Sequence, residues 1–393
     1  MKILYILSVS WGGIPHYTAE LANAISKYAD VVVLKPEDSN DRLFSERVTI
    51  VKAFKPLHFS RQCLARAFSL SNIKSFLSYR NVRMVEAVKP DVVHFTELYP
   101  WSSTFSFLYK IWRKHPVVST LHATFKSPLH LLNTKNFLYS LLACATELTK
   151  HLVKSDAIIV HTTEDRDTLI RRGVDPRKVF VIPHGAYELF GKVKGGEGKE
   201  NKENSEENCV LFFGYIIESK GVEYLIRAIP LISKEVPDVK VIIAGEGNLA
   251  KYNKLINDKA RFEIYNTFIP NEMVSKLFKR AKVVVLPYTY HRGQSGVLNI
   301  ARAFGKPVVV TSVGDLPNMV EDGRDGLVVP PKDPKALAEA IIRLLKDDKL
   351  RRQMGRNALR KAEELSWDNI AKMHMKVYEE VLNEWGKKFS RVR

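Results

Sequence analysis

Residues 290–311, YHRGQSGVLNIARAFGKPVVVT, join a polar, glycine-containing turn to a helix-like run and then to a run of valines. Ser295 is a favourable N-cap residue, and Gly293 and Gly296 leave the start of the helix uncrowded. A helix N-terminus presents free backbone N–H groups and a partial positive charge, which suit a phosphate. The pattern therefore predicts a phosphate-binding helix entrance, and an ordinary buried helix of an α/β domain is the alternative.

Two other turns offer similar chemistry. Gly12 and Gly13 precede a helix that begins near Pro15, and their freedom at positive φ would allow the backbone to approach a ligand closely. This turn lacks the G-x-G-x-x-G spacing, so it does not indicate a dinucleotide site. Lys220 and Gly221 precede an amphipathic run, where a lysine could reach a phosphate. An ordinary turn and a solvated lysine are the respective alternatives.

Histidines and one carboxylate follow other strand-like runs. His122 ends PVVSTLH, and a histidine at the carboxyl end of a parallel strand is a candidate catalytic residue. His94 and His161 also end strands, so position alone does not select His122, and a structural histidine is the alternative. Glu246 in IIAGEGN is either a ligand-binding group or a loop carboxylate.

The elements that must position these residues alternate along the whole chain. Short β-branched runs are separated by longer helix-like stretches such as residues 15–28, which is the βαβ pattern of parallel sheets covered by helices on both faces. We expect strands at 2–7, 30–35, 91–95, 116–122, 157–162 and 179–183, and then at 209–214, 239–245, 261–269, 282–288, 307–311 and 326–331. The length of 393 residues favours two domains. The almost wholly polar segment 191–208 is expected to be a linker or solvated loop.

The net charge of +18 indicates an anionic partner: nucleic acid, acidic lipid or a phosphate-bearing ligand. Zinc-finger spacings and RNA-binding aromatic motifs are missing from the sequence, so we do not expect nucleic acid as a partner. Residues 54–89 mix Lys and Arg with Phe, Leu and Tyr. They are expected either to lie on an anionic membrane or to form a basic face beside an anionic acceptor.

Hydrophobicity and cysteine content bear on the compartment. The apolar run 136–146 is too short to cross a membrane. The three cysteines form no C-x-x-C pair, which is typical of a reducing compartment. These features predict a cytoplasmic protein that is either free or peripheral on the inner face of the cell membrane.

Taken in order, the motifs resemble those of GT-B glycosyltransferases, most closely glycosyltransferase family 4. The resemblance covers nearly the whole chain and is strongest from 209 to 345, through FFGYIIESKGVEYLIRAI, IIAGEGN and ARAFGKPVVVTSVGDLPNMVEDGRDGLVVPP. It implies two doubly wound, Rossmann-like α/β domains facing across a cleft. The implied parts are an acceptor-binding domain at 1–190, a linker at 191–208, a nucleotide-sugar-binding domain at 209–365 and a helix at 366–393 that crosses back to the first domain.

The resemblance also implies an activity: a hexose-type sugar moves from a nucleotide-diphosphate sugar to a glycan or lipid-linked acceptor, with retention of configuration. His122 would lie near the reacting sugar, and Lys220 would hold the diphosphate. The other implied donor-binding residues are Gly12, Gly13, Glu246, Gln294, Ser295, Gly296, Val297 and Asn299. No cluster of Asp, Glu or His suggests a metal, so we expect neither a cofactor nor an obligatory metal.

The sequence departs from the family at three positions. Tyr215 stands where many members have a phosphate-binding Arg, and Arg292 and Ile300 stand where they have two glutamates. Neither Arg292 nor Ile300 accepts a hydrogen bond from a sugar hydroxyl. A non-catalytic donor-binding or scaffold protein of the same fold is therefore the alternative function.

Overall fold

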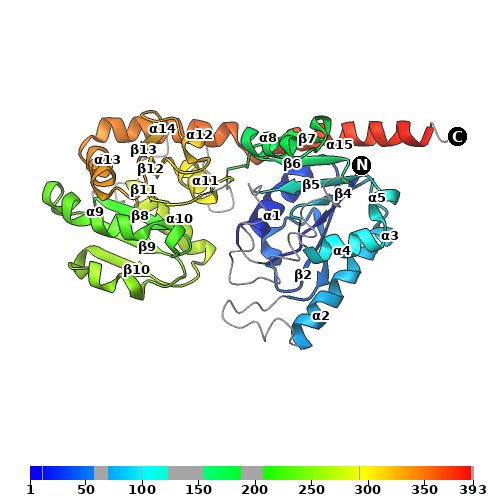
Figure 1. Ribbon diagram of the computed structural model, residues 1–393, viewed down its shortest axis with the longest axis horizontal. Helices are drawn as coiled ribbons and strands as arrows, with labels where there is room; N and C mark the ends of the chain where they lie inside the picture. Colours follow the sequence, from blue (N-terminus) through cyan, green and yellow to red (C-terminus); the bar gives the residue numbers. More distant parts are fainter. Residues whose placement is uncertain are drawn as a thin grey trace. The chain divides into compact units, whose positions relative to one another are not determined.

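A computed structural model of the chain describes residues 1–10, 12–56, 70–98, 100–122, 154–186, 207–291 and 293–390. The chain forms two compact units (Figure 1): unit 1 is Met1–His184 with Trp367–Arg393, and unit 2 is Gly185–Ser366. Each unit contains one parallel sheet, which confirms the predicted pair of doubly wound α/β folds. The predicted linker 191–208 lies outside the described residues, apart from its last two.

The sheet of unit 1 is parallel and has the order β3-β2-β1-β4-β5-β6-β7. Its strands are β1 (Lys2–Ile6), β2 (Asp30–Pro36), β3 (Val48–Phe54), β4 (Val92–Phe95), β5 (Val117–Leu121), β6 (Ala157–Val160) and β7 (Val179–Val181). Six of them are strands that the β-branched runs predict. The edge strand β3 was missed, because Thr49 and Lys52 interrupt its apolar residues and only one neighbour pairs with it.

Helices cover the two faces of this sheet. They are α1 (Ile14–Ile25), α2 (Leu70–Ser78), α3 (Val85–Val88), α4 (Pro100–Leu108), α5 (Ile111–Lys114), α8 (Thr163–Arg171) and α15 (Trp367–Ser390), with 3₁₀ turns η1 (Asp41–Leu43), η3 (Tyr79–Met84) and η4 (Pro176–Lys178). The last helix, α15, packs on α1 (Figure 1). A cluster that includes Leu4, Ile6 and Phe95 packs instead against the region of η3, α4 and α5. The residues that end β4, β5 and β6 are thereby held between two packed layers.

The sheet of unit 2 has the order β10-β9-β8-β11-β12-β13. Its strands are β8 (Cys209–Phe213), β9 (Lys240–Ala244), β10 (Phe262–Tyr265), β11 (Val283–Leu286), β12 (Val308–Thr311) and β13 (Gly326–Val329). Side chains alternate between the faces, so Val210 and Phe212 join one cluster and Leu211 joins the other. Both sides of the sheet are therefore buried, which explains why its strands read as continuous apolar runs.

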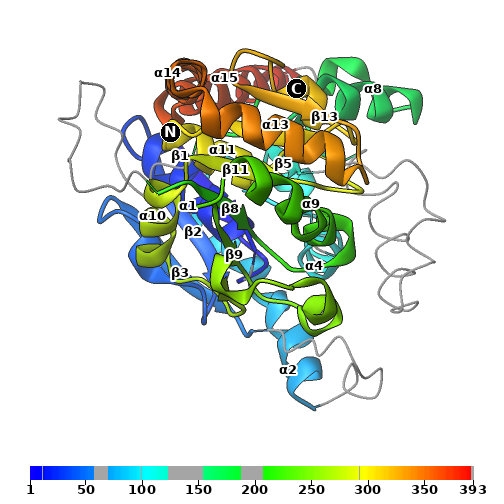
Figure 2. The same ribbon diagram turned by 90° about the vertical axis from the view of Figure 1, so that its left-hand side faces the viewer.

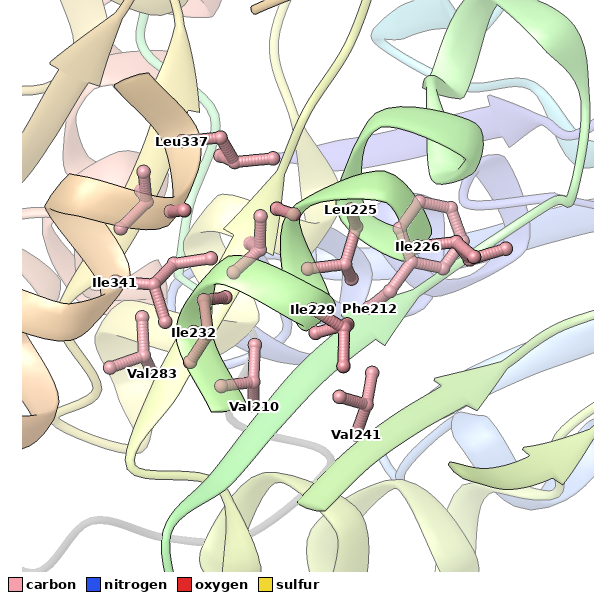
Figure 3. Packing of buried hydrophobic residues seen from close by; sticks show 14 of the residues in the cluster. Val210, Phe212, Leu225, Ile226, Ile229, Ile232, Val241, Val283, Leu337 and Ile341 are labelled. Carbon is pink, nitrogen blue, oxygen red and sulfur yellow. The ribbon is translucent and has the colours of Figure 1, made fainter. Parts of the chain in front are cut away.

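The helices of unit 2 are α9 (Val222–Glu235), α10 (Asn271–Arg280), α11 (Gly296–Ala303), α12 (Leu316–Met319), α13 (Pro334–Lys346) and α14 (Asp348–Glu364). The 3₁₀ turns are η5 (Glu218–Lys220), η6 (Ala250–Leu255) and η7 (Lys259–Arg261). Figure 2 shows α9 and α13 side by side. Figure 3 shows Leu225, Ile229 and Ile341 of these helices packed against the sheet. Full burial of one such side chain stabilises the fold by roughly 1.5–3 kcal/mol.

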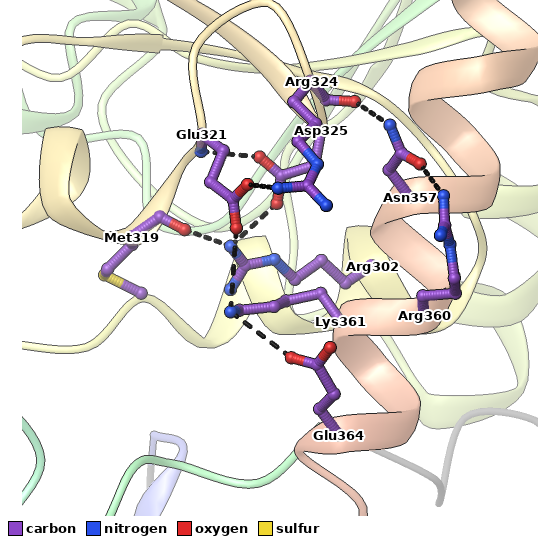
Figure 4. A network of polar contacts seen from close by, with 9 residues as sticks. All are labelled: Arg302, Met319, Glu321, Arg324, Asp325, Asn357, Arg360, Lys361 and Glu364. Carbon is purple, nitrogen blue, oxygen red and sulfur yellow. Dashed lines mark hydrogen bonds and ion pairs between the residues drawn. The ribbon is translucent and has the colours of Figure 1, made fainter.

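A polar network holds the C-terminal end of α11 (Figure 4). The buried Arg302 Nη2 lies 3.0 Å from Asp325 Oδ2 and also donates to the Met319 carbonyl. Asn357 of α14 donates to the Arg324 carbonyl at 2.7 Å, which ties the same loop to a second helix. Because α11 is anchored at this end, the position of its N-terminus is also fixed.

Candidate functional site

The loops that leave neighbouring strands of unit 2 touch backbone to backbone at glycines. Gly245, after β9, has φ 150°, and a Cβ there would overlap the carbonyl oxygen of Gly214 after β8. A Cβ on Gly247 would likewise overlap the Ile216 carbonyl. These contacts tolerate only glycine. They hold the two loops together at the carboxyl edge of the sheet, where ligands bind in such folds.

The turn that contains Lys220 is fixed to the loop after β11. Gly221 has φ 64°, and a Cβ there would overlap the Pro287 carbonyl oxygen. Thr289 donates its backbone N–H to the Ser219 carbonyl at 2.9 Å. Lys220 is thus placed by main-chain contacts, and not by its own flexible side chain.

The Lys220 side chain lies over an aromatic ring. Its Nζ is 3.7 Å from the ring centroid of Tyr288, which is fully buried. Burial lowers the pKa of Lys220 to about 8. Among the described residues no carboxylate forms an ion pair with this ammonium; the face of the ring is its cation–π partner. A partly desolvated cation of this kind should bind a phosphate strongly.

The entrance of α11 lies at the same edge. Ser295 caps the helix, since its Oγ accepts from the backbone N–H of Leu298 at 3.4 Å, as the sequence predicts. Val297 lies in the first turn of α11. Its Cγ2 atom would be 3.7 Å from a Cβ atom placed on Gly214. The start of α11, with Gly296 at its first position, therefore sits against the exit of β8.

The remaining predicted donor-binding residues differ in exposure. Gln294 is half-buried just before the helix, and Glu246 is exposed on the loop after β9. Asn299 is fully buried on α11. Ile300, at the position of a family glutamate, packs in the apolar cluster with Leu298 and so faces the core. Arg292 lies outside the described residues.

Residues that the sequence patterns missed also lie here. Asp315 accepts from the Gly293 backbone N–H at 2.7 Å and so shapes the loop before α11. The ring centroid of His291 is 5.3 Å from that of Tyr288. Burial, and then the charge of Lys220, lower the pKa of His291 to about 4. The sequence signal for His291 and Tyr288 was only their place after a buried strand.

In unit 1, Gly12 and Gly13 form the turn between β1 and α1. Gly12 has φ 74°, a conformation that favours glycine, and Gly13 is the N-cap of α1 with φ −82°. The carbonyl of Gly13 accepts the first intrahelical hydrogen bond, from Tyr17, at 2.9 Å. The predicted glycine turn is therefore a real helix entrance.

His122 follows β5 and is engaged through both ring nitrogens. Nε2 lies 2.9 Å from the Thr96 carbonyl oxygen, and Nδ1 lies 3.1 Å from His161 Nε2. Burial, followed by the neighbouring His161, lowers the pKa of His122 well below its ordinary value. Tyr17 and His184 complete an aromatic cluster around this pair. In this arrangement both ring nitrogens of His122 contact other groups of the protein.

Comparison with known sequences decides the family. A Glycosyltransferase Family 4 model matches residues 11–186, and the model described as Glycosyl transferases group 1 matches residues 207–347. The chain belongs to the group 1 family of glycosyl transferases. The two matches cover both units, including the Gly12 turn, the Lys220 turn and the α11 entrance.

Individual members of the transferase family are more distant. An uncharacterized glycosyltransferase of Methanocaldococcus jannaschii is 29% identical over 76% of this chain and 77% of that protein. A D-inositol 3-phosphate glycosyltransferase of Corynebacterium diphtheriae is 31% identical over 57% of this chain. That match spans only 56% of the relative's length.

Solved structures support the GT-B fold. HepE of Anabaena, solved in complex with UDP, has a TM-score of 0.67 and 18% identity, and the match covers 97% of this chain and all of that one. Sucrose-phosphate synthase of Thermosynechococcus elongatus has a TM-score of 0.70 and 21% identity, over 98% of this chain and 100% of the other.

Among the described residues, no group of three or more His, Cys, Asp and Glu side chains is arranged to hold a metal ion. No helix in the described part of the chain is both long and apolar enough to span a bilayer.

Proposed function

We propose that the protein is a retaining glycosyltransferase that moves a hexose-type sugar from a nucleotide-diphosphate sugar to a glycan or lipid-linked acceptor. The observation that carries this proposal is Lys220, a half-buried ammonium over the Tyr288 ring that has no carboxylate partner among the described residues. It lies at the edge where the glycine loops and the start of α11 also lie. That combination suits the diphosphate of a donor.

The proposed reaction is a front-face substitution. The bond from the anomeric carbon to the diphosphate oxygen breaks, and the acceptor oxygen bonds to that carbon on the same face. The proton of the acceptor hydroxyl passes to the leaving diphosphate. Lys220 and the free N–H groups at the start of α11 stabilise the charge that develops on the leaving group. The proposed reaction uses neither a cofactor nor a metal.

The other residues have supporting parts in the proposal. Gln294, together with Glu246, contacts the sugar or the ribose of the donor, and Gly12 and Gly13 lie by its phosphates. Asn299 is fully buried, so it would act only through the position of α11. His122 contributes to the surroundings of the reacting sugar, with its ring held by the Thr96 carbonyl and by His161.

A nucleotide-sugar panel tests the proposal. UDP-, GDP- and ADP-sugars are incubated with the protein and a lipid or glycan extract, and products are identified by mass spectrometry. Lys220→Ala should lower turnover by about a hundredfold, the usual effect of losing one contact to a developing charge. Lys251→Ala is the matched control, because this more exposed lysine also lies over a tyrosine ring. Equal turnover in the two variants would remove Lys220 from the mechanism.

A second candidate is a non-catalytic donor-binding protein. Ile300 favours it, because an apolar side chain packed in the core replaces a family glutamate. The same panel separates the two candidates. Tight nucleotide-sugar binding with neither transfer nor slow donor hydrolysis would establish the second.

We further propose that unit 1 meets an anionic membrane on the cytoplasmic side, where a lipid-linked acceptor would be found. On α2, Ile73 and Leu77 lie one helical turn apart and are 43% and 47% exposed. Leu108, at the end of α4, is 62% exposed, and Lys74 and Lys110 are exposed nearby in sequence. Apolar side chains among cations suit an anionic bilayer surface. Of the predicted segment 54–89, residues 57–69 lie outside the described part.

Vesicle sedimentation tests the membrane proposal. Vesicles rich in an anionic lipid should sediment the protein at low salt, and high salt should weaken the binding. Leu77→Glu should reduce the bound fraction. Failure to bind at low salt would contradict the membrane proposal and leave the transferase proposal untouched.

A further inference from the structure

In unit 1, hydrogen bonds hold the rings of His94, His122, His161 and His374, and their partners determine how many protons each ring needs. His374 has Nδ1 2.8 Å from the Ile370 carbonyl and Nε2 3.3 Å from the Tyr17 hydroxyl. A neutral ring satisfies both contacts, because Nδ1–H donates and Nε2 accepts from the hydroxyl. His94 faces two hydroxyl groups, which either donate or accept, so it too is satisfied when neutral.

The pair of His122 and His161 is different. His122 Nε2 faces the Thr96 carbonyl at 2.9 Å, and His161 Nδ1 faces the Ile182 carbonyl at 2.8 Å. A carbonyl oxygen only accepts, so both of these outer nitrogens must carry a proton. The inner nitrogens, His122 Nδ1 and His161 Nε2, lie 3.1 Å apart. The three contacts therefore need three protons, whereas two neutral rings carry two.

We propose that His122 and His161 share one additional proton between their inner nitrogens, and that His161 is a positioning residue that fixes the His122 ring by this bond. The proton comes from solvent and gives the pair a single positive charge. Without it, two lone pairs oppose each other at hydrogen-bond distance, so one ring must give up a carbonyl contact. Proton uptake completes the three bonds and locks both rings.

The surroundings set the pH range in which this happens. The titratable groups that face the pair are Tyr17 of α1, His184 after β7, His94 of β4 and His374 of α15. Burial lowers the pKa of both members, that of His161 to about 4. The pair therefore gains its third proton below the ordinary histidine pKa of about 6.5 and holds two at neutral pH. Lowering the pH adds the shared proton and so completes the hydrogen bond between His122 Nδ1 and His161 Nε2.

Histidine NMR of the full chain tests the inference without any assay of transfer. With ¹⁵N-labelled imidazoles, spectra are recorded from about pH 8 down to about pH 3, because the pKa values of the pair are lowered and that of His161 is about 4. His122 and His161 should shift together, and in the acid form both outer nitrogens should be protonated. His374 is the internal control and should keep the Nδ1–H form at neutral pH. Independent titration of His122 and His161 would overturn the proposal.

Two substitutions sharpen the test. In His161→Gln the side-chain amide supplies an N–H to His122 Nδ1, so His122 should keep its Nε2–H form at neutral pH and lose the shared titration step. In His161→Leu no donor is present, and the step should be lost without that fixed tautomer. A His122 titration in His161→Gln that matches the wild type would refute the positioning role. If a variant does not fold, the wild-type spectra alone decide.

Discussion

Replacing Lys220 by Met removes its charge and keeps a long side chain over the Tyr288 ring, where Nζ now lies 3.7 Å from the centroid. A hydrogen bond to a charged group contributes roughly 1.5–3 kcal/mol, so a diphosphate should bind about 10- to 150-fold more weakly to Lys220→Met. Met retains the packing on the ring, so the loss reports the charge itself. UDP, which the HepE structure contains, is a convenient probe.

The pH dependence follows from the same lysine. Its pKa is lowered to about 8 in the folded protein. If UDP binds the charged form, the affinity of the wild type should fall as pH rises through 8. Roughly nine-tenths of Lys220 is charged one unit below its pKa and one-tenth one unit above, so Kd should increase about tenfold between pH 7 and 9. Titration calorimetry over this range measures the change.

Lys220→Met provides the reference for that titration. In this variant the affinity should be weak already at pH 7, and its pH dependence should reflect only the nucleotide. Lys251→Met, on the exposed 3₁₀ turn η6, controls for a general change of surface charge. The reasoning is refuted if Lys220→Met binds UDP as tightly as the wild type, or if wild-type affinity does not change between pH 7 and 9.

Three other predictions concern stability. Burial lowers the pKa of His374 to about 4, so as pH falls below about 6.5 the unfolded chain takes up a proton before the folded one does. The free energy of unfolding should therefore fall by up to about 3 kcal/mol toward pH 4. Urea unfolding measures this loss, and His374→Gln should reduce it. Gly221→Ala should destabilise by at least roughly 2 kcal/mol, because it adds a clash with a backbone carbonyl to the strain of positive φ; Gly323→Ala, with positive φ but open space, should lose only about 1. Asp325→Ala removes the carboxylate partner of buried Arg302 and should lower the free energy of unfolding by about 3–5 kcal/mol. Glu321→Ala breaks only exposed ion pairs and should lower it by less than about 1 kcal/mol. Equal losses in the two variants would contradict this difference between buried and exposed pairs.

Much of the fold follows from the sequence because buried parallel strands need apolar residues on both faces. Runs such as DVVHF and KVVVLPY have few other ways to bury their side chains. Most of the predicted strands were one to a few residues too long, whereas the prediction 30–35 stopped one residue short of β2. The edge strand β3 was not predicted. Only one of its two edges pairs with a neighbouring strand, so its residues need not be uniformly apolar.

The candidate site could be predicted only where its chemistry is local. Ser295 as an N-cap depends on residues three positions away, and the structure places it so. The contact of Lys220 with Tyr288 joins positions 68 residues apart in sequence, and the bond of His122 to His161 spans 39. No periodicity encodes such pairs. They arise from the order of strands in the sheet, which places sequence-distant loops side by side at one edge.

The helix α15 also governs the order in which the protein can fold. Tyr378 of α15 is hydrogen-bonded to the buried Tyr5 hydroxyl at 3.0 Å and to His94 at 2.7 Å, although Tyr5 is 373 residues away in the chain. During synthesis, every residue of unit 2 is added to the chain before Tyr378, the partner of Tyr5 and His94, is made. An N-terminal fragment ending at His184 would contain the whole unit 1 sheet but would leave these buried polar groups unsatisfied. A stop codon just before Tyr378 would therefore damage the first unit while leaving every residue of the second in place.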